Sequence, residues 1–271
     1  MTESTSFSLL TQYSRGRVVQ IKPNNIHRKF AVHEDLLCAT SKLFRNRLQK
    51  HRKLNEGERS ICHEELNAIK ADITFCRSKC GQNYHQHCLE DWKNSPLDGG
   101  VTCPLCRHDR TPEPTAVLAL PGPNDFEPET LQTYIDWLYT GTIQVDPKIP
   151  PESDEFNVYL LKAMSLACTV ADEEFASSLK AHLVAHFESK VNTGFRKASI
   201  EYAFGAESYI PVKHFVLWSA LSNMSGRQVF SGMDQLSDAV VQAIDDSLMQ
   251  LRRYWFMTTT SGEYELVDAE E

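Results

Sequence analysis

The chain carries the segment Phe75-Cys76-Arg77-Ser78-Lys79-Cys80-Gly81-Gln82-Asn83-Tyr84-His85-Gln86-His87-Cys88, followed further along by Cys103-Pro104-Leu105-Cys106. Six of the eight cysteines lie between residues 62 and 106. Soft ligands separated by two or three residues meet on one tight turn, which is how proteins hold zinc in a tetrahedron. In a secreted chain this spacing could be a disulfide framework, whereas closely spaced thiolates in a reducing compartment are more often metal ligands. The cluster therefore predicts bound zinc.

Composition and charge narrow the class of protein. The 271 residues are 41% hydrophobic and 24% charged, as in an ordinary globular chain. The net charge is −8, and it is uneven, because the first 60 residues carry +7 and the remainder −15. This acidic balance argues against direct binding to nucleic acid.

The N-terminal residues lack the basic start and apolar core of a secretory signal. The longest apolar run, residues 215–221, is far shorter than the roughly 20 residues that span a bilayer. We therefore expect an intracellular chain, in the cytoplasm and/or nucleus, without a membrane partner.

Hydrophobic periodicity outside the cysteine cluster predicts an α+β fold. Residues 18–22 and 29–33 read as a strand hairpin, and residues 34–49 as two short helices broken near Thr40 and Ser41. A short strand is expected at 116–120, and a helix from about 127 that closes at Gly141. Further helices are expected at about 87–92, 154–168, 172–187, 215–221 and 236–251, with Cys38 and Cys168 as small buried side chains.

The cysteine cluster resembles the RING finger family, in which ligands one, two, five and six bind one zinc and the other four bind a second. The resemblance assigns one complete site to four cysteines, Cys76, Cys80, Cys103 and Cys106. It assigns the other site to Cys62, His85 and Cys88, and the family's first ligand falls at Arg59. Arginine stays protonated and offers no lone pair to a metal. His63, His87 or a carboxylate such as Glu58 could complete this shell; otherwise the site is weakened, or the finger holds one zinc.

A RING finger recruits a ubiquitin-conjugating enzyme, and no residue of the finger forms a covalent intermediate with ubiquitin. The family uses an apolar residue between the first two ligands, an aromatic residue after ligand six, a proline in the last turn and a cation after the last ligand. Those positions hold Ile61, Trp92, Pro104 and Arg107. The alternative interpretation is that Trp92 and Pro104 only pack the core of a small zinc module.

The segments on either side of the finger resemble the two halves of a BTB (POZ) fold, a small sheet with helical hairpins. Residues 30–45 are similar to its second strand and helical hairpin, and residues 126–141, which include Trp-Leu-Tyr-Thr-Gly, to a later helix. The predicted domains are a disordered N-terminus (1–16), the first BTB half (17–53), an inserted RING-like finger (54–114), the second BTB half (115–187), a helical extension like that of fungal BTB proteins (188–257) and an acidic disordered tail (258–271). A long insertion in a surface loop costs little closure entropy.

Two functions are compatible with this organisation. The first is a zinc-binding ubiquitin ligase, or ligase adaptor, that aligns a ubiquitin-conjugating enzyme with a bound protein. The second is a non-enzymatic interaction module, in which a degenerate finger is structural and the BTB frame forms a homodimer or docks on a cullin. Cullin-binding BTB proteins carry an apolar-x-Glu motif after the helical hairpin, and Leu54-Asn55-Glu56 fits this pattern.

Overall fold

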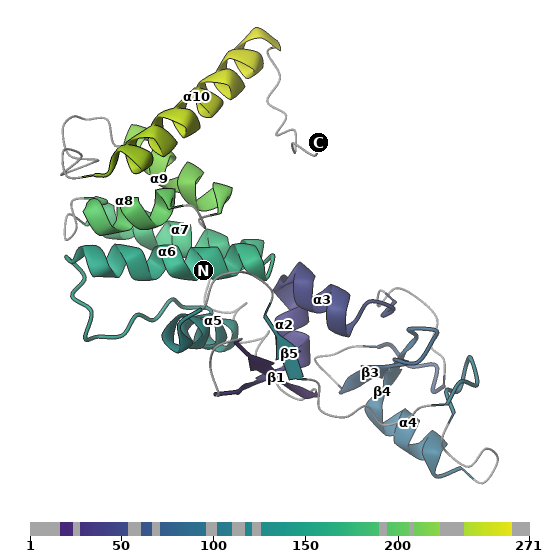
Figure 1. Cartoon of the computed structure of the whole chain (residues 1–271). Coiled ribbons are helices and arrows are strands. Elements are labelled where there is room, and N and C mark those ends of the chain that lie inside the picture. The colour runs from purple at the N-terminus through teal and green to yellow at the C-terminus, as the bar shows by residue number, and fades with distance from the viewer. Residues whose placement is uncertain are drawn as a thin grey trace. The chain divides into compact units, whose positions relative to one another are not determined.

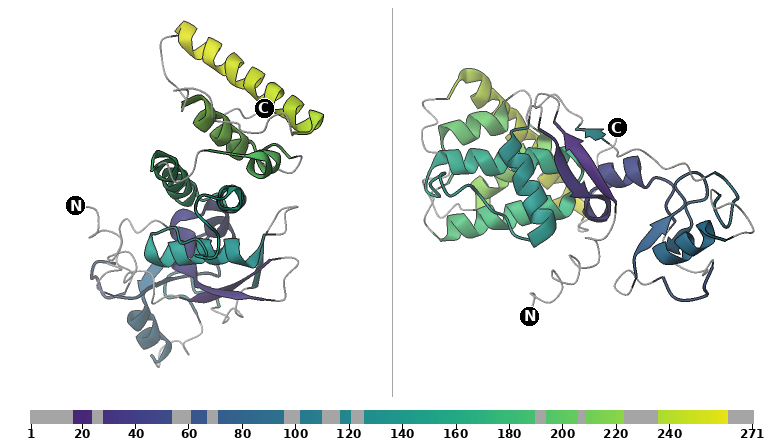
Figure 2. Two further views of the ribbon diagram at one scale, coloured as in Figure 1. Left: turned by 90° about the vertical axis from the view of Figure 1, so that its left-hand side faces the viewer. Right: turned by 90° about the horizontal axis from the view of Figure 1, so that it is seen from below.

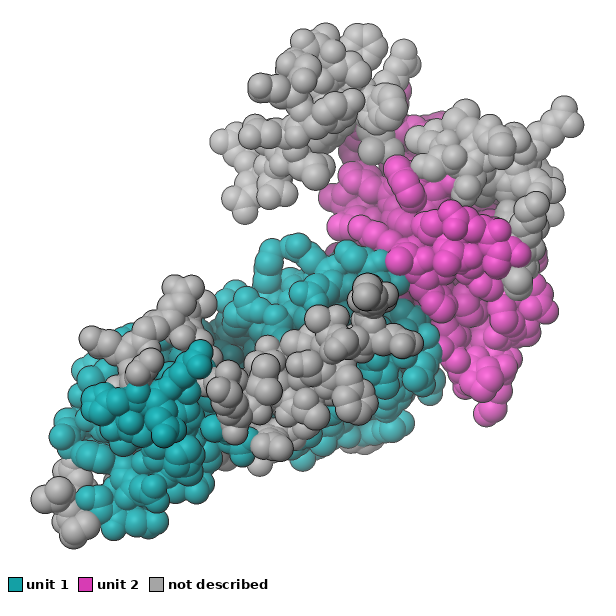
Figure 3. Space-filling view, turned by 180° about the vertical axis from the view of Figure 1, so that it is seen from behind, with its two compact units in different colours: residues 1–144, 166–178 teal, residues 145–165, 179–271 magenta. Residues whose placement is uncertain are grey.

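The computed structural model describes residues 17–23, 28–53, 61–66, 71–95, 102–109, 117–120, 126–189, 194–205, 209–222 and 236–261. Within these residues the fold is a mixture of α and β, with a three-stranded sheet, a two-stranded sheet and nine helices (Figure 1). The chain forms two compact units, which Figure 3 separates by colour. One contains Met1–Gln144 and Leu166–Ser178, and the other contains Val145–Ser165 and Leu179–Glu271.

The three-stranded sheet is built around β1 (Val18–Lys22). β2 (Phe30–His33) pairs with it antiparallel, and β5 (Val117–Ala119) pairs with it in parallel from the other side. Side chains alternate across the sheet, so Val19 and Ile21 are buried opposite Val32 and Phe30. The predicted hairpin and the predicted short strand near residue 117 are confirmed.

Two short helices, α2 (Glu34–Thr40) and α3 (Lys42–Leu48), follow β2, and the predicted break lies between them. Ser41 has an extended backbone, and its hydroxyl accepts a hydrogen bond from the N–H of Phe44, which caps α3. The Arg45 guanidinium donates to the carbonyls of Cys38 and Ala39, which have no helical partner at the end of α2.

Helix α5 (Pro128–Thr140) begins with proline in its first turn and ends at Gly141, whose φ is 70°. This left-handed conformation suits glycine, and the predicted helix end is confirmed. Tyr134 and Trp137 of α5 pack on Phe175, with ring centroids 4.9 and 5.0 Å away.

A buried acid ties three of these helices together. Asp172, which is fully buried, precedes α7 (Glu173–Glu188) and accepts a hydrogen bond from the Phe175 N–H at 2.9 Å. Its other carboxylate oxygen accepts from the hydroxyls of Tyr134 (2.9 Å) and Thr40 (2.5 Å). One carboxylate therefore caps α7 and joins it to α5 and α2.

The described parts of the segment between α3 and β5 hold two short strands and one helix, β3 (Ile73–Phe75), β4 (Asn83–His85) and α4 (Gln86–Lys93), which Figure 2 shows from two further sides. β3 and β4 pair antiparallel, with Phe75 opposite Asn83. A short helix at 87–92 was expected from the sequence and is confirmed, whereas the strand pair was not predicted. We call the described residues 61–66, 71–95 and 102–109 the finger, and β1, β2, β5, α2, α3 and α5 the frame.

The second unit is helical where the structure describes it. It contains most of α6 (Asp154–Thr169) and α7, together with α8 (Lys197–Phe204), α9 (Ile210–Ser222) and α10 (Asp238–Ser261). The Asp154 carboxylate accepts from the backbone N–H groups of Arg196 and Ser199, which fastens the start of α8 to α6. The predicted helices are confirmed, and α10 ends within the segment expected to be disordered.

Three further predictions concern the burial of two cysteines, membrane-spanning helices and the chain ends. Cys38 is buried as expected, whereas Cys168 is only partly buried. Among the described helices, none combines the length and the apolar character that crossing a membrane would require. The predicted disordered N-terminus (1–16) and the tail after Ser261 lie outside the described residues.

Candidate metal centre

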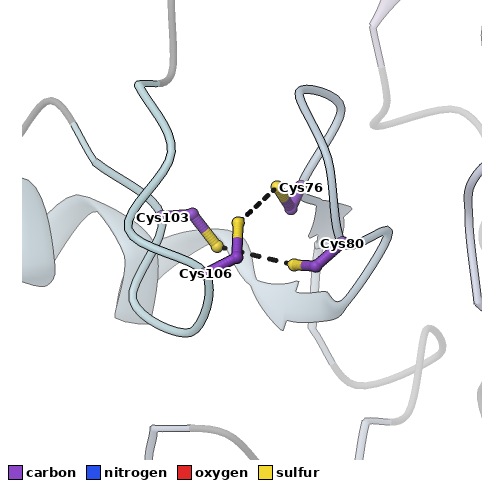
Figure 4. A group of neighbouring side chains, drawn as sticks. All are labelled: Cys76, Cys80, Cys103 and Cys106. Atoms are coloured by element: carbon purple, nitrogen blue, oxygen red, sulfur yellow. Dashed lines mark hydrogen bonds between the residues drawn. The ribbon is translucent and has the colours of Figure 1, made fainter.

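Four cysteine side chains converge between two loops of the finger (Figure 4). Cys76 and Cys80 come from the turn after β3, and Cys103 and Cys106 come from the facing loop. The Sγ atoms of Cys76 and Cys106 are 3.8 Å apart, and those of Cys80 and Cys103 are 3.7 Å apart. A zinc–sulfur bond of about 2.3 Å gives a tetrahedron with edges of about 3.8 Å. The four thiols, which are free of disulfides, therefore could hold a metal ion of this kind.

The backbone of the first loop explains why the two thiols face the same point. The Cys76 N–H donates to the Gln82 carbonyl at 2.9 Å, and the Gly81 N–H donates to the Cys76 carbonyl at 3.1 Å. Gly81 has a φ of 67°, and a Cβ atom there would lie 1.5 Å from the His51 carbonyl oxygen. Only glycine fits this position, where the finger touches the chain that leaves α3.

The same loop supplies hydrogen-bond donors to one of its sulfurs. Burial acts to raise the pKa of the Cys76 thiol, but hydrogen bonds from the backbone N–H groups of Lys79 and Cys80 and from the Ser78 hydroxyl outweigh it and lower this pKa to about 6. Burial raises the pKa of Cys80 to about 12, and its neighbouring thiols add to the effect. The four cysteines, which we call the cysteine group, therefore combine Cys76, which ionises readily, with Cys80, which a metal ion would have to deprotonate.

Tyr84 packs against the cysteine group. Its fully buried side chain belongs to a small core with Leu89, Cys76 and Cys103. The phenol oxygen lies 3.2 Å from Cys103 Sγ, within hydrogen-bond distance of the sulfur. Burial and this neighbouring sulfur raise the pKa of Tyr84, so the phenol stays protonated and keeps its donor. Sequence reasoning had not selected this residue, which sits one position before the ligand His85.

A second group, which we call the mixed group, consists of Cys62, His85 and Cys88. His85 Nδ1 lies 3.2 Å from Cys62 Sγ and 3.8 Å from Cys88 Sγ. The other ring nitrogen, Nε2, lies 3.1 Å from the Glu65 carbonyl, which can only accept. This contact assigns the proton to Nε2 and leaves the Nδ1 lone pair directed at the two thiols.

Burial raises the pKa of Cys88 to about 11, and Cys62, Asp91 and Glu64 reinforce this shift. A metal cation bound at the mixed group would thus offset the negative charge of these neighbouring side chains. Arg59 and Glu58, at and beside the position of the family's first ligand, lie outside the described residues. The seven selected ligands fall into two groups that alternate along the chain, as expected from the sequence.

Residues selected for contact with a conjugating enzyme lie around this framework. The Arg107 guanidinium sits over the Trp92 ring, 5.1 Å from its centroid, and the Trp92 indole N–H donates to the Thr102 carbonyl at 3.3 Å. Ile61 packs against the small core of the finger. Pro104 is partly exposed, and its neighbour Leu105, which sequence reasoning had passed over, is 55% exposed.

Two arginines connect the finger to the frame. Arg77 of the finger pairs with Glu34 at 2.8 Å, and Arg52, just after α3, pairs with Asp35 at 2.8 Å and donates to Asn83 at 2.9 Å. The two guanidinium groups lie over the buried Phe75 ring, 4.3 and 5.0 Å from its centroid. A polar cavity of about 380 Å³ lies beside these contacts.

Comparison with known proteins gives a limited but relevant similarity. No family model matches the chain. A stretch of 68 residues is 38% identical to mouse E3 ubiquitin-protein ligase Zswim2, covering 23% of this chain and 11% of that protein. A stretch of 56 residues is 36% identical to human E3 ubiquitin-protein ligase ZSWIM2, covering 20% of this chain and 9% of that protein. The chain thus spans about a tenth of the length of these relatives and is similar in part to two ubiquitin ligases.

Proposed function

We propose that this protein is a zinc-binding, RING-like ubiquitin ligase or ligase adaptor. The observation that carries the proposal is the alternation of the two ligand groups along the chain, in which Cys62 and the His85–Cys88 pair enclose the first cysteine pair in sequence. Each ion would then cross-link distant parts of one small module, which has little core of its own. Thiolate and imidazole ligands favour zinc among the available divalent ions.

The mechanism would be that of a scaffold. Ile61, Trp92, Pro104 and Leu105 would offer apolar contacts to a ubiquitin-conjugating enzyme, and Arg107 would hold the ubiquitin that the enzyme carries. Zinc would supply rigidity only, because both groups are built from protein ligands and the chemistry would occur on the conjugating enzyme. The partial similarity to two E3 ubiquitin-protein ligases supports this assignment.

The test is ubiquitin transfer by the purified full chain with an activating enzyme and a panel of conjugating enzymes. We expect ubiquitin chains attached to the protein itself or to other proteins in the assay mixture. Cys80→Ser should abolish transfer, because it removes a ligand from the cysteine group. Cys168→Ser, in α6 and outside both groups, is the matched control and should leave transfer unchanged. Inactivity of the parent chain with every enzyme of the panel would contradict the proposal.

We further propose that residues 17–53 and 115–187, which contain the frame, α6 and nearly all of α7, form a BTB domain. The finger would be inserted in this domain, and the protein would work inside the cell. Support comes from the β1–β2 hairpin, the α2–α3 pair, the parallel β5 and the left-handed end of α5. Such a frame would form a homodimer or dock on a cullin. The motif Leu54-Asn55-Glu56, on which cullin docking was predicted, lies outside the described residues.

A non-enzymatic interaction module is the second candidate function. The observation that favours it is the mixed group, which offers three ligands where a closed structural zinc site has four. Measuring the mass of the protein by light scattering, alone and with a cullin N-terminal domain, separates the two docking modes. A monomer that binds no cullin and yet transfers ubiquitin would exclude both docking modes and support only the ligase function.

A further inference from the structure

Among the described residues the mixed group has three ligands, one fewer than a closed zinc site, and the side chain of His87 lies against one of them. Zinc with sulfur at about 2.3 Å and nitrogen at about 2.1 Å has sulfur–nitrogen edges of about 3.6 Å. The three ligands are spaced accordingly, with His85 Nδ1 3.2 Å from Cys62 Sγ and 3.8 Å from Cys88 Sγ. A fourth ligand atom would have to lie at a similar distance from each of the three.

His87 meets one of these three distances, although its ring as it stands is not within 4.8 Å of all three ligand atoms. Its Nε2 atom lies 3.3 Å from Cys88 Sγ, within the range of the other sulfur–nitrogen distances. Its ring stacks on that of His85, with centroids 5.3 Å apart and planes at 16°. His87 is exposed on the first turn of α4, where its side chain could extend into solvent. Its imidazole instead contacts the Cys88 thiol.

The local charges agree with this placement. The group already holds two thiols, Cys62 and Cys88, which bind a metal ion as thiolates. A neutral imidazole adds a ligand without adding charge. Two thiolates and two imidazoles form one of the common closed zinc shells, whereas three ligands leave a position for water.

We propose that His87 is the fourth ligand of the mixed group and replaces the ligand that Arg59 cannot supply. The shell would then be Cys62, His85, His87 and Cys88, with a rotation of the His87 ring bringing Nε2 onto the ion. This inference rests on the proposed zinc binding and adds a ligand that the RING pattern does not contain. It also explains how Arg59 can stand at the family's first ligand position without loss of the second ion.

Native mass spectrometry of the full chain, refolded with zinc and challenged with a competing chelator, tests the assignment. We expect two zinc ions in the parent chain and one in His87→Ala, with the affinity of the second ion falling at least about tenfold. His63→Ala is the matched control, since it removes another exposed imidazole beside the mixed group, and should keep both ions. Cobalt substitution gives a second readout, because His87→Ala should lower the intense visible absorption of tetrahedral cobalt at one of two sites.

A rescue variant guards against a mere folding defect. His87→Ala combined with Arg59→Cys should bind two ions again, since the cysteine restores the ligand of the RING pattern. Two ions of undiminished affinity in His87→Ala would overturn the inference. One ion in the parent chain would overturn it too while leaving zinc at the cysteine group, and no ion at all would overturn the proposed zinc binding as well.

Discussion

The guanidinium of Arg77 lies 2.8 Å from the carboxylate of Glu34, and Glu34 is only 1% exposed. Arg77 directly follows the ligand Cys76, whereas Glu34 opens helix α2 of the frame. Arg17 approaches the other carboxylate oxygen at 3.8 Å, and the Gln49 amide donates at 3.1 Å. A loop that carries candidate metal ligands is thus joined to the frame by a partly buried ion pair.

Arg77→Ala should lower the free energy of unfolding by about 2–4 kcal/mol, because it removes the nearer of the two described cations, Arg77 and Arg17, that pair with the buried Glu34 carboxylate. Urea unfolding followed by fluorescence measures the change. Lys79→Ala, on the same loop, removes an exposed cation without a buried partner and should change stability by less than about 0.5 kcal/mol.

The pair is tested directly by a double-mutant cycle with Glu34→Gln. Once the charge of Glu34 has been removed, Arg77→Ala should cost clearly less than it does in the parent chain. Equal costs in both backgrounds would show that Arg77 acts through its packing on Phe75 rather than through Glu34.

Asp172→Ala should destabilise the chain by about 2–4 kcal/mol, because it removes the cap of α7 and leaves the buried hydroxyl of Tyr134 without its acceptor. Asp172→Asn should cost less, since the amide keeps an acceptor. Glu174→Ala, two residues on and exposed, is the matched control. Thermal unfolding of the three variants gives the comparison, and equal midpoints for Asp172→Ala and Glu174→Ala would contradict the role assigned to Asp172.

Sequence reasoning succeeded where a local rule fixed the outcome. Gly141 marked the end of α5, because a left-handed helix end depends on a few neighbouring residues. The two candidate ligand groups agree with the assignment that the resemblance to the RING finger family implied. Contacts between distant segments could not be predicted in this way. Arg77 and Glu34 are 43 positions apart, and no periodicity relates them. Similarly, the Gln86-His87-Cys88 segment predicted a helix but not that the imidazole would turn toward a thiol.

The second unit should lose stability as the pH falls below about 6.5. Burial, together with the charge of His186, lowers the pKa of His182 from its ordinary value. Above pH 6.5 the residue is neutral in both states and has no effect. As the pH falls through that value, the unfolded chain binds a proton that the folded chain resists, so unfolding becomes easier until the folded pKa is passed.

His182→Gln should therefore reduce the difference between the melting temperatures at pH 7.5 and pH 5.5. His214, whose pKa is also lowered by burial, contributes in the same direction and would leave a remainder in this variant. Differential scanning calorimetry at the two pH values provides the measurement. An unchanged difference in His182→Gln would assign the pH dependence to other groups.

Arg107→Ala should reduce ubiquitin transfer at least about tenfold, or about 1.4 kcal/mol, with its zinc content unchanged. The guanidinium lies over Trp92 and belongs to neither ligand group, so its removal leaves both groups intact. The residue has a φ of 56°, and alanine meets the same strain there, which makes the exchange neutral for the backbone.

His108→Ala, the next position and also exposed, controls for a change near the last ligand. Arg107→Lys keeps the charge and should retain part of the activity, since a cation near Trp92 remains. Full activity of Arg107→Ala, with two ions bound, would restrict Arg107 to packing on Trp92 and remove it from the transfer step.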